Sequence, residues 1–137
     1  LIIVVIALLP TLMYVFTIKS LSTGGIDGGG IAGAYIGLVF LSAAFTAIGI
    51  CCSSFTNNAV VAFLSSAFAC FILYNGFTTI SGIPSLQGGW DYFIEMIGIN
   101  FHYRSLSRGA VDSRDMIYFL SIIVLFLFIT RKKLLNR

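Results

Sequence analysis

Polar and apolar positions along this chain are separated into long blocks. Four apolar stretches contain no charged residue, at residues 1–18, 31–52, 59–78 and 116–130. As a helix, the second stretch would extend about 33 Å, which is enough to cross a hydrocarbon core of about 30 Å. The fourth would extend only about 22 Å, so we expect Arg131 and Lys132 to lengthen it by reaching toward the membrane surface. The pattern predicts an all-α integral membrane protein with four transmembrane helices.

Composition agrees with a membrane location. Hydrophobic residues make up 58% of the chain and charged residues only 9%, whereas about a quarter of a typical soluble domain is charged. The chain also starts inside an apolar stretch, at Leu1, without the basic segment and small-residue cleavage site of a signal peptide. We therefore expect residue 1 to lie in or at the edge of a transmembrane helix of a longer protein.

Small residues are concentrated in the second apolar stretch. Gly33 and Gly37 lie four residues apart, and several Ala, Ser and Thr residues lead on to Gly49. Small side chains let helix backbones approach closely in lipid, where there is little hydrophobic drive between helices. Gly33, Gly37 and Gly49 are therefore predicted to form a helix-packing face.

A short uncharged segment at 53–58 separates the second and third stretches. Its polar side chains suit helix caps and turns because they bond to free backbone donors. So short a turn predicts an antiparallel pair of helices on either side of it. The polar residues of this turn are Ser53, Ser54, Thr56, Asn57 and Asn58.

Residues 79–115 are too many for a turn and too aromatic for a plain linker. Asp91 and Glu95 fall on one helical face, and apolar residues fall on another. Amphipathic aromatic segments favour the boundary between membrane and water. We expect two short helices here, hinged near Gly98, as an amphipathic or re-entrant hairpin before the last span. The apolar residues at helical spacing are Trp90, Phe93, Ile97 and Phe101.

Two carboxylates precede the last span. Asp112 is placed to cap its N-terminus, and Asp115 falls where a negative charge stabilises the positive end of the helix dipole.

Catalytic chemistry has one candidate centre in this sequence. His102 is the only histidine, with Ser105 and Ser107 as nearby hydroxyls and Asp91 or Glu95 as side chains able to orient its ring. The spacing does not select this arrangement over a histidine that makes hydrogen bonds at the membrane boundary. Both interpretations therefore stay open.

The sequence lacks other motifs for cofactors. The glycine-rich segment fits the Walker A spacing from Gly24 to Gly29, but Gly30 occupies the lysine position, so the chain is not expected to hydrolyse ATP. The three cysteines have no metal-ligand spacing and are expected to be packing residues. We predict neither a metal nor a cofactor. These cysteines are Cys51, Cys52 and Cys70.

Charge gives the orientation only in part. The net charge of +3 arises largely from a basic tail, which is typical of a cytoplasmic membrane anchor rather than a nucleic-acid site. The loops on the other side hold equally many basic residues, so the density of the tail alone favours a cytoplasmic C-terminus. The tail holds Arg131, Lys132, Lys133 and Arg137, and the opposite loops hold Lys19, Arg104, Arg108 and Arg114.

Two regions resemble a known family. Residues 35–63, with their small and polar positions, and residues 102–119, before and into the last span, resemble the ABC-2 type transporter permeases. Within that family they are most similar to the gliding-motility-associated permeases of Bacteroidetes-type bacteria. The resemblance covers residues 31–137.

The resemblance implies a six-helix permease of the bacterial cytoplasmic (inner) membrane, with its C-terminus in the cytoplasm. This chain would supply helices three to six, without the coupling helix that precedes them. A second permease copy or homologue and cytoplasmic ATP-binding cassette subunits would be its partners, and those subunits would hydrolyse ATP. The turn at 53–58 would face the cytoplasm, where it is a candidate contact for the ATPase as well as a capping turn.

The resemblance also places the hairpin at 79–115 on the outer side of the membrane. Its aromatic and charged residues are then candidates for an outer gate on the path of a polysaccharide, lipid or protein substrate. Two alternatives remain, a non-transporting membrane scaffold and an intramembrane enzyme centred on the single histidine. The candidate gate residues are Trp90, Phe93, His102, Arg104 and Arg108.

Overall fold

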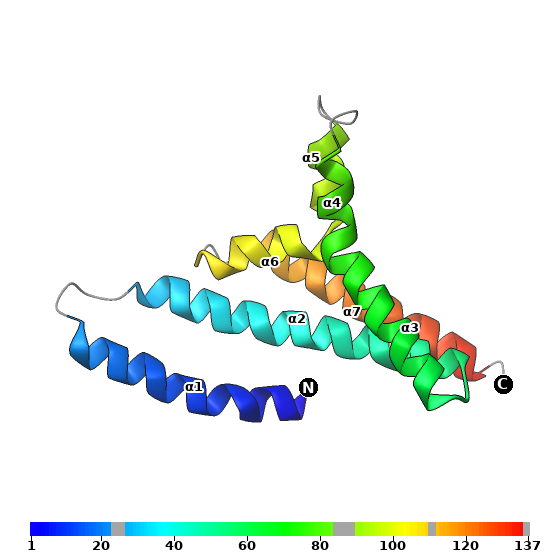
Figure 1. Ribbon diagram of the computed structural model, residues 1–137, viewed down its shortest axis with the longest axis horizontal. Helices are drawn as coiled ribbons and strands as arrows, with labels where there is room; N and C mark the ends of the chain where they lie inside the picture. The colour runs from blue at the N-terminus through cyan, green and yellow to red at the C-terminus, as the bar shows by residue number, and fades with distance from the viewer. Residues whose placement is uncertain (23–26, 84–89, 110–111, 136–137) are drawn as a thin grey trace.

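The protein is described here by a computed structural model that covers residues 1–22, 27–83, 90–109 and 112–135, without the side chain of Trp90. Within this part of the chain the secondary structure is helical, with no strand (Figure 1). The segment from Ala59 to Ser81 is one continuous helix whose middle part, Ile72–Gly76, is π-helical. The elements are α1 (Ile2–Leu21), α2 (Gly28–Phe55), α3 (Ala59–Phe71), η1 (Ile72–Gly76), α4 (Phe77–Ser81), α5 (Trp90–Ile97), α6 (Ile99–Ser107) and α7 (Ser113–Leu135).

The four expected spans are present as helices long and apolar enough to cross a membrane. They are longer than the uncharged stretches alone. α2 begins after Asp27, whose carboxylate accepts a hydrogen bond from the Gly30 amide at 3.2 Å. α7 continues through Lys132 and Lys133, since long basic side chains can reach polar surroundings from a helix end. The chain is thus an all-α protein of membrane-spanning type.

Helices α2 and α7 lie side by side and run in the same direction (Figure 1). Their facing aromatic rings include Phe40 and Phe119, with centroids 6.1 Å apart. At the C-terminal ends of both helices, the Lys133 ammonium lies 5.3 Å from the centre of the Phe55 ring. The basic end of α7 therefore lies beside the turn that follows α2.

The turn after α2 reverses the chain, and α3 packs on α2 near the turn but diverges from it farther along (Figure 1). Asn58 caps α3, because its side-chain oxygen accepts from the amides of Val60 at 2.9 Å and Val61 at 3.4 Å. The Thr56 hydroxyl accepts from the Asn58 amide at 3.2 Å. Capping is therefore an observed role of this turn.

Ser53 and Ser54 belong to the last turn of α2 rather than to the connecting segment. Ser54 is buried, and its hydroxyl donates to the Cys51 carbonyl at 2.7 Å. Asn57 is an exposed residue of the turn itself.

The core lies where α2, α6 and α7 meet. Small residues on α2, such as Ala44, leave room for larger side chains from the other two helices. Partly buried residues of α3 and η1, including Tyr74, pack around this cluster. The fully buried members are Ala44, Ile48, Ile99, Leu106 and Phe119.

Two of the three glycines predicted to pack helices lie at a close contact, and that contact is with α6. A Cβ on Gly33 would lie 2.6 Å from the Leu106 carbonyl oxygen, and one on Gly37 would lie 3.2 Å from the Leu106 Cβ. A Cβ on Gly49 would meet no described atom within 4 Å. Gly49 therefore lies at no close contact between helices. Gly49 of α2 and Thr130 of α7 instead line an open groove between these two helices.

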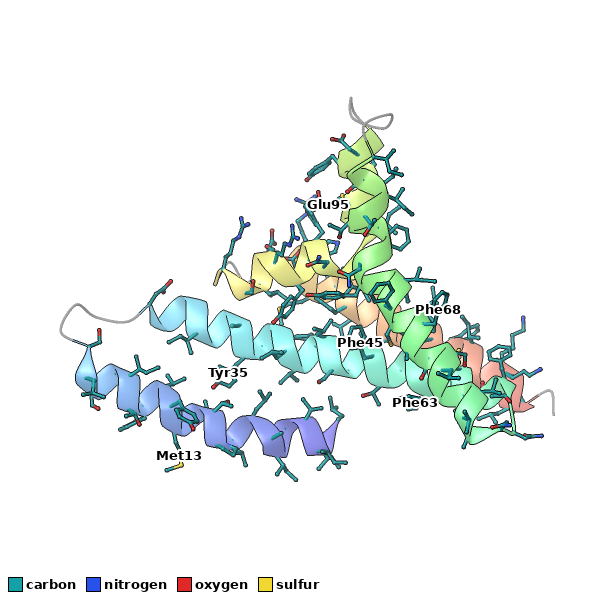
Figure 2. The ribbon with its side chains drawn as sticks, viewed as in Figure 1. Met13, Tyr35, Phe45, Phe63, Phe68 and Glu95 are labelled. Atoms are coloured by element: carbon teal, nitrogen blue, oxygen red, sulfur yellow. The ribbon has the colours of Figure 1, made fainter. Side chains whose placement is uncertain are left out.

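Helix α1 stands apart from the others. None of its residues is buried, and Met13 points away from α2 while Tyr35 of α2 points toward α1 (Figure 2). Thr11 and Tyr35 join the two helices through their hydroxyl groups, 2.7 Å apart. Large apolar side chains such as Phe63 and Phe68 on α3 are also exposed, at 70% and 66%. These surfaces suit contact with lipid or with another membrane helix.

Candidate functional site at the α5–α6 hairpin

The two short helices expected before the last span are α5 and α6, and they meet at Gly98. Gly98 is buried and extended, with a ψ of 139°, which ends α5 and redirects the chain into α6. A Cβ on Gly98 would lie 3.1 Å from the Cβ of Phe77 on α4. The close approach of α4 therefore favours glycine at the hinge.

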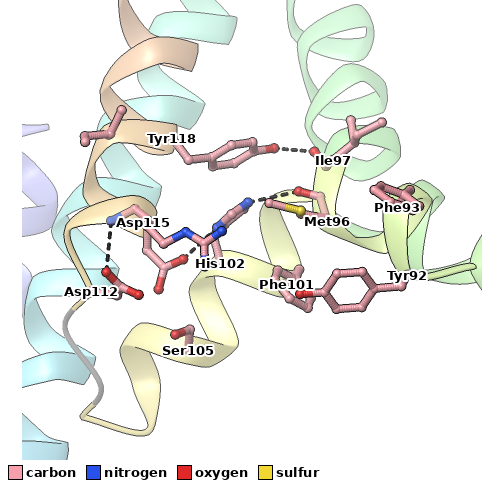
Figure 3. A pocket seen from close by; sticks show the side chains of 12 residues that line it. Tyr92, Phe93, Met96, Ile97, Phe101, His102, Ser105, Asp112, Asp115 and Tyr118 are labelled. Carbon is pink, nitrogen blue, oxygen red and sulfur yellow. Dashed lines mark hydrogen bonds and ion pairs between the residues drawn. The ribbon is translucent and has the colours of Figure 1, made fainter.

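His102 of α6 makes hydrogen bonds to both α5 and α7 (Figure 3). Its Nδ1 lies 2.6 Å from Asp115 Oδ1 on α7, and its Nε2 lies 2.9 Å from the Met96 carbonyl oxygen on α5. The side chains of His102 and Asp115 are only 6% and 7% exposed. A buried polar pair of this kind is stabilising only when its hydrogen bonds are made.

The hydrogen bonds fix how the pair holds its protons. A carbonyl oxygen only accepts, so His102 Nε2 carries a hydrogen and donates to Met96. One further proton lies between His102 Nδ1 and Asp115 Oδ1. The pair is therefore either imidazolium with carboxylate or imidazole with carboxylic acid. Its total charge is zero in both states, which is compatible with burial.

Aromatic rings hold His102 in this position. The Tyr118 ring stacks on the imidazole with centroids 3.8 Å apart and an interplanar angle of 23°. The Tyr118 hydroxyl donates to the Ile97 carbonyl at the end of α5. The Phe101 and His102 rings are nearly perpendicular, with centroids 5.4 Å apart. Residues of α7 thus hold both short helices against the start of the last span.

A pocket of about 670 Å³ opens between α5, α6 and α7, next to this pair. Aromatic and aliphatic side chains form most of its wall, among them Tyr92, Phe93 and Ile117. Asp115 also lines it, and its second oxygen, Oδ2, is buried with no hydrogen-bond partner among the residues that the structure describes. The remaining polar residues of the pocket are His102, Ser105, Asp112 and Arg114.

The structure separates the candidate gate residues into two groups. Phe93 and His102 line the large pocket. Arg104 and Arg108 line a second pocket of about 380 Å³ together with Glu95. Arg104 Nη1 lies 3.7 Å from Glu95 Oε1 in an ion pair that is partly exposed. The side chain of Trp90 lies outside the described residues.

The carboxylate that orients His102 is neither of the two that the sequence offers for this role. Asp115 holds the ring, whereas Glu95 pairs with Arg104. The sequence predicts that Asp115 stabilises the positive end of the helix dipole, and its position in the first turn of α7 also brings it to the hairpin. Asp112 does cap α7, because its carboxylate accepts from the Arg114 amide at 3.2 Å.

This geometry does not favour a serine hydrolase. Both nitrogens of His102 are engaged, one by a carboxylate and one by a carbonyl, so neither is directed at Ser105 as a base. The Ser107 hydroxyl donates to the Arg104 carbonyl at 3.0 Å.

The site therefore combines a hairpin held by buried hydrogen bonds with an open, largely apolar pocket. Its described side chains offer hydrogen-bonding groups and aromatic rings. Among the described residues, no group of three His, Cys, Asp or Glu side chains is placed to hold a metal ion. Searches of this chain against known protein families, curated proteins and solved structures find no match.

Proposed function

We propose that this chain is the membrane-spanning permease subunit of a bacterial ABC-2 type transporter, in the cytoplasmic membrane, with its C-terminus in the cytoplasm. The observation that carries the proposal is the α5–α6 hairpin. It packs against the start of the last span, at the end of the protein opposite the basic tail (Figure 1). A hairpin in this place is what the resemblance to ABC-2 type permeases implies.

The course of the chain supports the same proposal. α2 and α7 run in one direction, and the helix from Ala59 to Ser81 starts at the turn after α2 and leads away from that end to α5. The turn after α2 and the basic residues Lys132 and Lys133 thus share one end. Basic residues favour the cytoplasmic side, so the hairpin is assigned to the outer side.

In the proposed mechanism, ATP binding and hydrolysis in separate cassette subunits move two permease copies against each other. His102 and Asp115 would carry a movement of α7 to the hairpin, because they join the two by a buried hydrogen bond. Phe93, which lines the pocket, would then act in the outer gate. The substrate, and membership of the gliding-motility-associated group, are open within this proposal.

The test is to purify the tagged full-length protein in a mild detergent and identify its partners by mass spectrometry. We expect an ATP-binding cassette subunit in stoichiometric amount and ATPase activity in the complex. An unrelated multi-pass membrane protein with the same tag and detergent is the control for nonspecific capture.

Permeases also differ from scaffolds in their effect on the ATPase. A permease is expected to change the ATPase rate of the isolated cassette subunit when the two are combined in lipid. A monodisperse protein without a cassette partner would contradict the permease proposal and favour a membrane scaffold.

A further inference from the structure

The two carboxylate oxygens of Asp115 differ, because only one of them has a hydrogen-bond partner among the described residues. Oδ1 bonds to His102, and the shared proton lies on that side of the carboxyl group. Oδ2 is therefore an acceptor, and it is buried without a donor among the described residues. A buried acceptor without a partner is unfavourable. Since Asp115 is 5% exposed and lines the 670 Å³ pocket, a donor from a bound molecule would relieve this.

The pocket is larger and more apolar than a water site needs. A water molecule occupies roughly 30 Å³ of liquid, a small fraction of the pocket's 670 Å³. Tyr92, Phe93 and Phe101 present ring faces and edges to the remaining space. The space suits a molecule with a donor group at one end and an apolar body (Figure 3).

An apolar surface continues from the pocket along α7. Ile117 lines the pocket, and Leu120 and Val124 follow it at helical spacing on the same face. The three side chains are 63%, 50% and 63% exposed. α7 is long and apolar enough to span a membrane, so this stripe runs from the pocket into the hydrocarbon region. An acyl chain fits such a stripe, which favours a lipid over a soluble ligand.

Charges at the rim indicate which headgroup fits. Asp112 and Arg114 both line the pocket and are exposed, and they carry opposite charges. The pair of His102 and Asp115 adds no net charge. The pocket thus matches a headgroup that has one positive and one negative group.

We propose that this pocket binds a zwitterionic aminophospholipid of the phosphatidylethanolamine type. The primary ammonium donates to Asp115 Oδ2 and lies near Asp112, the phosphate pairs with Arg114, and an acyl chain follows the stripe on α7. This site does not depend on the transporter proposal, because it requires only that α7 spans a membrane.

The test uses native mass spectrometry of the delipidated full-length protein titrated with phospholipids that share the same acyl chains. Phosphatidylethanolamine is expected to bind about 10-fold more tightly than phosphatidylcholine, whose trimethylammonium has no N–H donor, because a hydrogen bond to a charged group is lost. Phosphatidylglycerol tests a hydroxyl donor on a lipid of net negative charge, and is expected to bind more weakly than phosphatidylethanolamine.

Three variants connect the binding to the pocket. Asp112→Asn removes the rim carboxylate that lies near the ammonium and keeps a side-chain oxygen to cap α7, so the preference for phosphatidylethanolamine should fall severalfold. Phe93→Ala should weaken binding of all the lipids severalfold. Phe63→Ala, which removes a similarly exposed ring from α3 away from the pocket, should leave binding unchanged.

The proposal is overturned if the unmodified protein does not prefer phosphatidylethanolamine, or if it prefers phosphatidylglycerol. A preference retained in full by Asp112→Asn overturns it as well. Arg114→Gln, also on the exposed rim, is the second test. Severalfold weaker binding by Arg114→Gln supports the site, and unchanged binding overturns it.

Discussion

Gly33 on α2 and Gly109 at the end of α6 touch through their backbones. A Cβ on Gly33 would lie 2.8 Å from the Cα of Gly109. Gly109 has a φ of +81°, and a Cβ there would lie 2.7 Å from the Cα of Gly30. The hairpin is thus fixed to α2 by backbone contact at one end, and to α7 by His102 at its middle.

Gly33→Ala should destabilise the folded protein. Overpacking costs about 1–3 kcal/mol, and here the Cβ would meet backbone atoms that cannot rotate away. Alanine regains at most roughly 1 kcal/mol over glycine from helix propensity. Unfolding by SDS in mixed micelles, followed by circular dichroism, measures the difference.

Gly49→Ala on the same helix is the matched control for this effect. Its Cβ would enter open space, so helix propensity should leave stability unchanged or raise it by up to roughly 1 kcal/mol. Equal destabilisation by both substitutions would show that glycine itself, and not the contact with α6, matters in α2.

Breaking the buried pair should be more costly than breaking the exposed one. His102→Ala leaves the Asp115 carboxyl buried without its partner, which should cost about 3 kcal/mol. Arg104→Ala removes the pair with Glu95, which is partly exposed and should cost less than about 1 kcal/mol. The same SDS titration compares the two variants.

A double-mutant cycle separates the pair from its surroundings. The loss in the combined His102→Ala and Asp115→Ala variant should be well below the sum of the single losses, because the second substitution removes the stranded partner. Additive losses would mean that the two side chains act independently, contrary to the 2.6 Å contact.

Much of the fold could be predicted from the sequence because lipid imposes a simple requirement. An uncharged apolar stretch of sufficient length has to be a helix, since its backbone groups find no water. The predicted stretches 31–52 and 116–130 therefore lie inside α2 and α7. Both helices extend beyond these stretches, because Asp27 caps α2 and α7 continues past the predicted lengthening by Arg131 and Lys132.

The site was harder to predict because it depends on contacts between distant parts of the chain. The hinge at Gly98 follows from a local change in pattern, whereas the partner of His102 lies thirteen residues away across a turn. The π-helical segment at 72–76 has no comparable local signal. Gly49 and Gly33 look alike in sequence and differ only in what faces them.

Asn58→Ala should destabilise the protein by about 1 kcal/mol, because its side chain caps α3. Asn58→Ser keeps a capping oxygen and should restore most of the loss. Ser65→Ala is the control, since it removes an exposed hydroxyl in the middle of the same helix. If Asn58→Ser also lowered the ATPase activity of a complex while restoring stability, the turn would have a contact role beyond capping.

The orientation of the chain can be measured at two exposed positions, Asn57 in the turn after α2 and Arg108 at the end of α6. Each is changed to cysteine in a variant without the native cysteines and treated with a membrane-impermeant maleimide in spheroplasts. The expected result is labelling of Arg108→Cys before lysis and of Asn57→Cys only after lysis, because the basic end of α7 lies beside the turn. The reverse result would place the basic tail outside and contradict the permease proposal.

The same labelling also tests the span from Ala59 to Ser81. In either orientation only one of the two sites should react before lysis, because this helix separates them. Labelling of both sites before lysis would therefore contradict the assignment of that helix as a span.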